Sequence, residues 1–167
     1  AGRLAAQEIS ADEFLRLAAQ ETQSAQSQSA DYATVDLDRF TRCGFPEVIF
    51  VEVKSPEMIT TIAKKILAEN QPVLVTRVDQ DKSVPLLDEL PQARYNPVGR
   101  VMRMDPARWQ RKFVGQVAVI TAGTSDLPVA EEARETLDWM VVAATMVHDV
   151  GVAGPHRLPE RLAEFAE

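Results

Sequence analysis

The apolar run VAVITA at residues 117–122 constrains the fold more than any other stretch of this sequence. Its residues show little polar alternation, a pattern typical of a strand that is buried on both faces of a parallel sheet. The turn sequence AGTSD follows, and Pro128 then suits the first turn of a helix. Because parallel strands need a crossover connection, this stretch predicts a strand–helix–strand unit in an α/β protein.

The residues after the turn complete this unit. TMVHDVGVAG at residues 145–154 is the expected second strand with its loop, and such crossovers are right-handed. We therefore expect an α/β fold class, with a small N-terminal α/β unit followed by the first βαβ unit of a doubly wound, flavodoxin-like parallel sheet. The crossover helix is expected to place on one face Ala130, Ala133, Leu137, Met140, Val141 and Ala144.

The small N-terminal unit is expected within residues 36–104. Ser55, Pro56 and Glu57 supply an N-cap, a first-turn proline and an acidic first turn, so a helix should follow through residue 67. Strands are predicted at VIFVEV, PVLVTR and, with alternating burial, VGRVMRM, whereas VPLLDEL predicts a short helix or turn.

The N-terminal stretch is different in composition. Ser10 and Glu13 have the spacing of a capping box, which predicts a helix over about residues 11–20, and a Gln- and Ser-rich linker follows. We therefore divide the chain into an N-terminal helix and linker at residues 1–35, a small α/β domain at residues 36–115, and an incomplete second domain at residues 116–167.

Charge and composition exclude several classes of protein. Eighteen Lys and Arg residues against twenty-five Asp and Glu residues give a net charge of −7, which disfavours nucleic acid as a partner. A phosphorylated small molecule remains compatible, because local amides and one or two arginines can outweigh the overall sign. Cys43 is the only cysteine, which fits a reducing compartment, and the apolar runs are too short for a transmembrane segment. We expect a soluble protein of the cytoplasm, or of an organelle interior if a targeting segment was removed.

The AGTSD turn is the first candidate site. Loops at the carboxyl ends of parallel strands hold ligands, because helix N-termini there offer unpaired N–H groups. Gly123 lets a ligand approach the backbone, and Thr124 and Ser125 can donate to a phosphate or a hydroxyl. Asp126 can accept from a ribose. The simpler interpretation, in which Ser125 or Asp126 is only an N-cap, stays open.

The loop GVAGPHRLPE follows the neighbouring parallel strand, so both loops should reach one ligand. His156 has a pKa suited to proton transfer, and Arg157 can bind a phosphate or carboxylate. The alternative is that His156 caps a helix and Arg157 forms a surface ion pair. His148 is interpreted as a structural histidine of the strand, and two histidines without spaced acidic partners do not make a metal site.

Two further groups of residues have ordinary structural roles. Trp109 and Trp139 are expected to fill core or interface space rather than to stack on a base. The first unit also contains six scattered charged residues: Arg39, Arg42, Glu47, Lys54, Arg77 and Arg100. The sequence favours surface ion pairs for them. The alternatives are a dispersed anion site or a polar interface with the second unit.

Five motifs stand in the same order as in the LarB-like family, which the chain resembles over nearly its whole length: GFPEVIF, TR, YN, VAVITAGTSDLPVAEEA and DVGVAGPHRL. That family makes pyridinium-3,5-biscarboxylic acid mononucleotide, the first intermediate of the nickel-pincer nucleotide cofactor of lactate racemase. Its C-terminal domain is similar to phosphoribosylaminoimidazole carboxylase, a doubly wound fold that forms octamers. The resemblance implies that residues 116–167 begin such a carboxylase-like domain and that the chain is a homo-oligomer or part of a larger assembly.

The resemblance also implies roles for residues. Gly123, Thr124, Ser125 and Asp126 match the loop that holds the phosphate and ribose of the substrate. Gly154 and Arg157 belong to the second substrate-binding loop, and His156 matches the proton-transferring histidine of the carboxylases. Pro155 stands where the family more often has another apolar residue.

The implied reaction is carboxylation of the pyridinium ring of nicotinic acid adenine dinucleotide by CO2 or bicarbonate, with hydrolysis of the phosphoanhydride to release AMP. The resemblance implies no resident cofactor, and Mg²⁺ stays open. In the family a cysteine thiolate adds to the ring. That cysteine and the family's GMEGAL segment lie downstream of residue 167, and Cys43 does not align with it, so we expect the chain to lack most of the catalytic domain. A catalytically inactive homologue that serves as a structural or nucleotide-binding subunit is therefore the alternative to an enzyme.

Overall fold

The computed structural model describes residue 10, residues 27–30 and residues 33–161. The helix predicted at residues 11–20 lies outside the described residues. The first described elements are strands β1 (Ser27–Ala30) and β2 (Ala33–Asp36), which pair antiparallel, and helix α3 (Arg39–Cys43) follows them. Among the described residues, no helix is both long and apolar enough to cross a bilayer.

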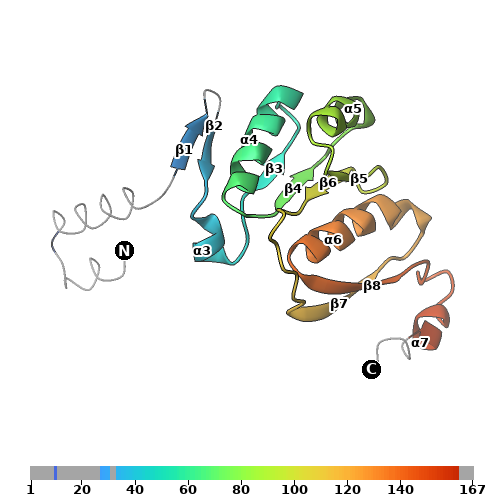
Figure 1. Ribbon diagram of the computed structural model, residues 1–167. Coiled ribbons are helices and arrows are strands. Elements are labelled where there is room, and N and C mark those ends of the chain that lie inside the picture. The colour runs from blue at the N-terminus through green and yellow to red at the C-terminus, as the bar shows by residue number, and fades with distance from the viewer. Residues whose placement is uncertain (1–9, 11–26, 31–32, 162–167) are drawn as a thin grey trace.

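A four-stranded mixed sheet forms the centre of the molecule (Figure 1). Its strands lie in the order β3-β4-β6-β5, with β3 and β4 parallel and the other pairs antiparallel. The bounds are β3 (Val48–Phe50), β4 (Val73–Thr76), β5 (Arg94–Asn96) and β6 (Val101–Met104), with helices α4 (Pro56–Ala68) and α5 (Gln80–Glu89) between them.

Helix α4 forms as its sequence predicts. The Ser55 hydroxyl accepts a hydrogen bond from the Met58 N–H at 3.3 Å, and Pro56 occupies the first turn, where its missing N–H costs nothing. Ile59, Ile62 and Ile66 are buried against the sheet. Each such side chain contributes about 1.5–3 kcal/mol by leaving water, so this packing rather than helix propensity fixes α4.

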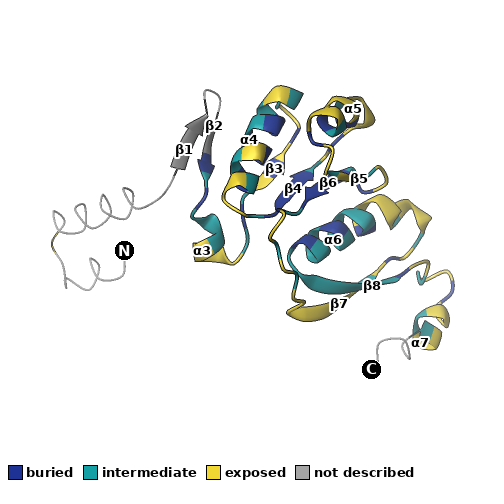
Figure 2. Ribbon diagram, viewed as in Figure 1, coloured by how far each residue is buried: buried dark blue, intermediate teal, exposed yellow. Residues whose placement is uncertain are grey.

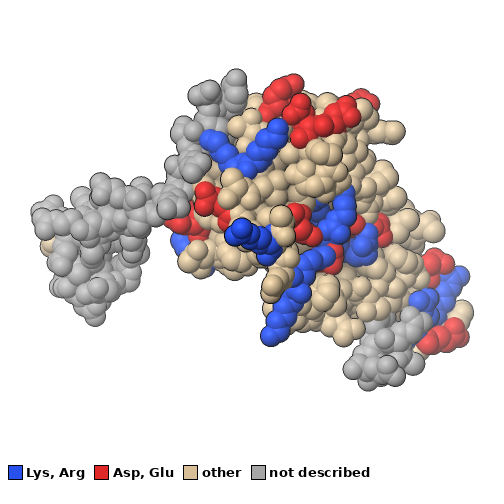
Figure 3. All heavy atoms as spheres, viewed as in Figure 1, with Lys and Arg blue, Asp and Glu red and all other residues tan. Residues whose placement is uncertain are grey.

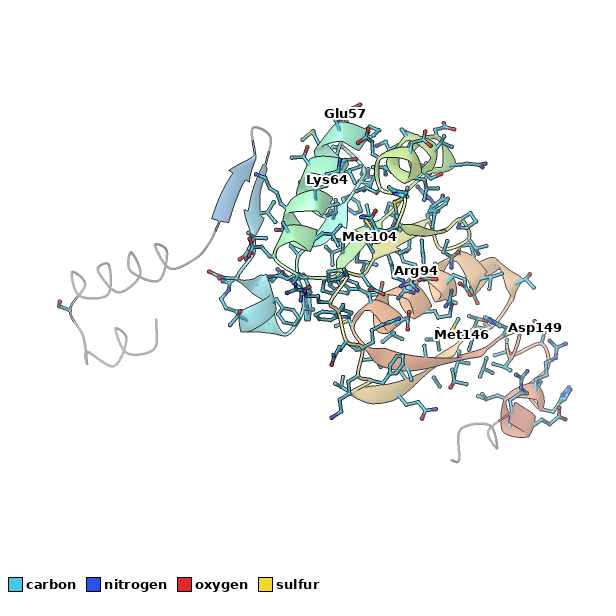
Figure 4. The ribbon with its side chains drawn as sticks, viewed as in Figure 1. Glu57, Lys64, Arg94, Met104, Met146 and Asp149 are labelled. Atoms are coloured by element: carbon cyan, nitrogen blue, oxygen red, sulfur yellow. The ribbon has the colours of Figure 1, made fainter. Side chains whose placement is uncertain are left out.

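Both faces of the central sheet are covered, which corrects the alternation predicted for VGRVMRM. All four residues of β6 are buried. Met102 and Met104 join the core beneath α4 and α5, and Val101 packs with Leu74 and Trp139 on the opposite face. Figure 2 shows β4 and β6 as buried strands, and Figure 4 labels Met104 on β6. The alternation is therefore between two buried environments and not between core and solvent.

The second sheet confirms the predicted strand–helix–strand unit and the α/β fold class. Strand β7 (Gly115–Ile120) pairs parallel with β8 (Val142–Val147), and helix α6 (Leu127–Trp139) crosses between them after the short 3-10 turn η1 (Thr124–Asp126). Helix α7 (Arg157–Arg161) comes after the second loop.

The crossover helix ends earlier than its apolar spacing predicts. Helix α6 stops at Trp139, and Val141 adopts a left-handed backbone with φ of 61°, so Ala144 lies in β8 instead of on the helix. The run of residues 141–147 contains several β-branched side chains, which favour a strand over a helix.

Helix α6 lies between the two sheets, with the β7–β8 pair on its far side (Figure 1). Trp139 is 3% exposed and packs in the cluster with Leu74 and Val101, and its ring meets Phe45 edge-on at 6.2 Å, which confirms its core role. Helix α6 contacts both sheets. The domain boundary predicted between residues 115 and 116 stays a prediction.

A buried ionic cluster fastens α6 to β6. Arg103, only 6% exposed, forms ion pairs with Glu135 at 2.6 Å and with Asp138, and Arg111 reaches Asp138 at 2.8 Å. Glu135 also accepts from Asn96 at 3.0 Å. Figure 3 shows basic and acidic side chains interleaved across the middle of the viewed face. The surface therefore has no field of one sign on this face. The buried charges of Arg103, Glu135 and Asp138 connect the central sheet to α6.

Two carboxyl groups of α6 have lowered pKa values. Burial alone would raise the pKa of Asp138, but hydrogen bonds and charge from Arg111 and Arg103 outweigh it. A hydrogen bond from Arg134 lowers the pKa of Glu131 against the opposing effect of burial, with help from Asn96 and the charge of His148. Both groups are therefore held as carboxylates in the folded protein.

Arg103→Met tests the buried cluster. Removing the guanidinium leaves the buried Glu135 with only Arg134 and Asn96 and leaves Asp138 with only Arg111, so we expect the free energy of unfolding in urea to fall by about 1.5–3 kcal/mol. The matched control is Arg94→Ala, which breaks the exposed pair between Arg94 and Asp105 and should cost less than about 1 kcal/mol. Equal losses in the two variants would contradict the assigned role.

The lowered pKa of Asp138 predicts a pH dependence of stability. A depressed pKa stabilises the fold above the ordinary value of 3.8, and this contribution is lost as the pH falls through the lower folded-state value. Urea unfolding should therefore show a stability gap between the natural chain and Asp138→Asn that is largest near neutral pH and shrinks in acid. A gap that is constant with pH would show that the carboxylate charge plays no part.

Candidate functional site

The carboxyl ends of β7 and β8 bring the two predicted loops together. Val150 N–H donates to the Thr121 carbonyl at 3.1 Å, and Gly151 N–H donates to the Ala122 carbonyl at 3.0 Å. These bonds extend the parallel ladder one step beyond the strands. The loop after β8 is consequently attached along the start of the AGTSD turn.

Asp126 organises the AGTSD turn from inside. Its carboxylate accepts hydrogen bonds from the N–H groups of Ala122 and Gly123, each at 3.0 Å. It stands at the N-cap position of α6, but its side chain reaches back into the turn and not forward to the helix. Asp126 thereby fixes the backbone of Ala122 and Gly123, directly before Thr124 and Ser125.

Two glycines in these loops meet different surroundings. A Cβ on Gly151 would lie 2.6 Å from the Ala122 carbonyl oxygen, so only glycine allows the two loops to approach this closely. A Cβ on Gly123 would have no heavy atom within 4 Å, and its φ of −151° suits any residue. There is therefore room for an additional atom beside the Gly123 backbone.

A cavity of about 250 Å³ opens at this edge of the sheet. Gly123 and Thr124 are the predicted site residues in its wall, and Asp149 comes from the second loop. Ser125 and Asp126 lie in the same turn but outside the wall. The lining residues are Thr121, Gly123, Thr124, Leu127, His148 and Asp149.

His148, which the sequence indicates as a structural histidine, lies in the wall of this cavity. It lies just past the end of β8, is exposed, and places its Nδ1 3.4 Å from the Thr121 hydroxyl. The contact with Thr121 is consistent with the structural role predicted from the sequence, although the residue lies one position beyond the strand. Its position at the carboxyl end of a parallel strand is the signal that could have found it.

Arg157 is held beside the cavity by the second loop. Its Nη1 donates to the Asp149 carboxylate at 2.8 Å and to the Asp149 carbonyl at 3.1 Å. The Arg157 side chain also packs closely on Gly154, where an added Cβ would lie 2.5 Å from its Nε. Figure 4 labels Asp149 at the end of β8, before α7, and its backbone has a left-handed φ of 60°.

His156 stays apart from this arrangement. It is exposed immediately before α7, its carbonyl accepts from the Glu160 N–H at 3.2 Å, and it is not in the cavity wall. In the part of the chain that the structure describes, no three His, Cys, Asp or Glu side chains gather in a way that could hold a metal ion.

Two comparisons with known proteins found similarities. Residues 27–106 match the model of the LarB/PurE-like N-terminal domain. An uncharacterized protein of Methanocaldococcus jannaschii is 34% identical over 140 residues, which cover 80% of this chain and 54% of that relative. The chain thus spans about half the length of the curated relative that it matches.

The contrast between the two glycines gives a test of the loop contact. Gly151→Ala should lower the free energy of unfolding by about 1–3 kcal/mol, because its methyl group meets a backbone oxygen that cannot move alone. Gly123→Ala should stay within about 0.5 kcal/mol of the natural chain. Thermal unfolding followed by circular dichroism measures both, and a destabilising Gly123→Ala would show that the turn has no open space.

Proposed function

Because the chain belongs to the LarB-like family through its LarB/PurE-like N-terminal domain, we propose that it binds a nicotinate nucleotide for carboxylation. The domain relates the chain to a family of carboxylases. In the proposed reaction a ring carbon of nicotinic acid adenine dinucleotide forms a bond to CO2 and loses its proton. Water cleaves the phosphoanhydride and releases AMP, which leaves pyridinium-3,5-biscarboxylic acid mononucleotide.

The open AGTSD turn is the observation that carries this proposal. Its backbone precedes the N-terminus of α6, where unpaired N–H groups and the helix dipole favour an anion. In the proposal a phosphate enters the cavity beside Gly123 close to the main chain, and the Thr124 hydroxyl in the wall donates to it. Asp126, already bonded to two amides, keeps this backbone in place for the ligand.

The second loop supplies charge and a proton acceptor. Arg157, oriented by Asp149 and Gly154, offers its remaining guanidinium donors to a phosphate or ring carboxylate. In the proposal His156 accepts the proton that leaves the ring carbon. His148 is the imidazole that lines the cavity, so separate glutamine variants at the two positions identify the acceptor. Cys43, exposed in α3, has no role in this scheme.

An alternative function is binding of the nucleotide without turnover, as a structural or nucleotide-binding subunit. The observation in its favour is the apolar surface of β7, where Val117 is 40% exposed and Ile120 is 49% exposed. An uncovered strand of this kind is a surface for contact with another chain. Binding and catalysis therefore need separate measurements.

A combined assay tests both functions. We expect nicotinic acid mononucleotide to bind in isothermal titration calorimetry, and incubation of nicotinic acid adenine dinucleotide with ¹³C-bicarbonate to give a labelled dicarboxylate and AMP in mass spectrometry. Binding without label or AMP would select the non-catalytic subunit. If the mononucleotide does not bind, both functions are overturned.

Gly123→Ala provides a sharper test of the site. The added methyl group meets no protein atom, so the fold should be unchanged, but it occupies the space that the proposed phosphate needs. We expect the dissociation constant of nicotinic acid mononucleotide to rise at least about tenfold. Gly115→Ala is the matched control, because its Cβ also has open space but lies at the other end of β7. Unchanged affinity in Gly123→Ala would remove the ligand from this turn.

A further inference from the structure

The central sheet contains a second pair of parallel strands with its own cavity. Strands β3 and β4 end side by side at Phe50 and Thr76, and the loops after them open a cavity of about 380 Å³. None of its residues lines the cavity at β7 and β8. The lining residues are Phe50, Glu52, Arg77, Asp79, Lys82 and Arg100.

The cavity gathers positive charge in an acidic protein. Arg77 follows β4, Lys82 lies in the first turn of α5, and Arg100 precedes β6, so three separate segments each contribute a cation. Two carboxylates, Glu52 and Asp79, share the wall. The chain as a whole carries a net charge of −7, so the local balance has the opposite sign.

Lys82 and Arg100 are held in place by neighbouring groups of the protein. Lys82 Nζ donates to the carbonyl oxygens of Val51 at 3.2 Å and Lys54 at 3.1 Å, which fixes the loop after β3 over the cavity. Arg100 Nη2 lies 2.6 Å from the Asp79 carboxylate. The site is thus built before any ligand enters.

Both arginines occupy an unusual backbone conformation. Arg77 has φ of 62° and Arg100 has φ of 54°, in the left-handed region that favours glycine. The Val78 N–H donates to the Arg100 carbonyl at 2.8 Å and joins the two segments. Strained residues of this kind concentrate at ligand sites, and here both carry a long cationic side chain where glycine would relieve the backbone.

One donor in this wall lacks a partner. Among the described residues, the buried Arg100 Nε has no hydrogen-bond acceptor. A buried donor without an acceptor is costly, and because this nitrogen is closed to solvent it marks a costly arrangement of Arg100 and not a direct contact with a ligand in the cavity. On the same wall Phe50 is 46% exposed, which is a large aromatic surface to leave in water.

We propose that this cavity binds a nucleoside monophosphate. The phosphate lies between the guanidinium groups of Arg77 and Arg100, where charge-assisted hydrogen bonds are strongest. The base stacks on the Phe50 ring, and the ribose hydroxyls donate to Glu52 or Asp79. The proposal does not depend on the function assigned to the AGTSD turn, because its residues and its strand pair are different.

The probe is AMP, titrated into the full chain by isothermal titration calorimetry at low ionic strength, with adenosine and inorganic phosphate as comparators. We expect AMP to bind more tightly than either fragment, since only AMP engages both the arginines and Phe50. Arg100→Gln and Arg77→Gln should each raise the dissociation constant at least about tenfold, and Phe50→Leu should weaken AMP but not inorganic phosphate.

Two control variants distinguish this cavity from the AGTSD turn and from a general effect of surface charge. Arg94→Gln removes a cation from the neighbouring strand β5 whose exposed partner is Asp105, and it should leave AMP binding unchanged. Gly123→Ala should likewise leave it unchanged. Arg100→Lys, which keeps the charge, should bind AMP more tightly than Arg100→Gln if the cation rather than the fold is responsible.

Two results would overturn the proposal. Loss of AMP binding in Gly123→Ala, with full binding in both arginine variants, would place AMP in the AGTSD turn. The absence of AMP binding to the natural chain would also overturn it, and the mononucleotide assay would be unaffected by that result.

Discussion

The ion pairs of Arg103 with Glu135 and Asp138 are the constraint on which the arrangement of this molecule depends. They join β6 to the C-terminal half of α6, and Arg103 and Glu135 are buried, so a shift of either element would separate charges in the interior. The position of α6 in turn determines where its N-terminus lies. Because the AGTSD turn leads directly into that N-terminus, the geometry of the candidate site is set by charges more than two helical turns away.

The same helix relates the two cavities. Gly99 in the turn before β6 packs so closely on the backbone of Glu131 and Glu132 that a Cβ would lie 2.8 Å from the Glu132 nitrogen. Arg77, in the wall of the cavity at β3 and β4, pairs with Glu132 at 3.4 Å. Glu132 lies six positions after Asp126, which is roughly 9 Å along the helix axis. The segments that line the two cavities are thus in contact with the same helix.

Much of this architecture could be predicted from the sequence where one local signal dominates. Ser55 and Pro56 identified the start of α4, and the apolar run before Gly123 identified a parallel strand followed by its helix. Prediction failed where tertiary packing decides. Helical spacing continued through Val141, although its left-handed backbone ends the helix, and Arg103 became a core residue only because α6 supplies carboxylates. The site at β7 and β8 was predicted as a pair of loops, but the place of His148 in the cavity wall depends on the strand ending at Val147.

Binding and catalysis at the β7–β8 edge make different demands on the protein. The turn and Arg157, to which the proposed function assigns the phosphate, are both held by contacts within the described residues. Carboxylation requires in addition that a nucleophilic ring carbon meets CO2 before it meets water, so the cavity must be closed to solvent. The face of β7 is largely exposed, with Val117 and Ile120 in contact with water. In the proposed function, turnover therefore depends on a part that covers this strand, whereas recognition of the phosphate does not.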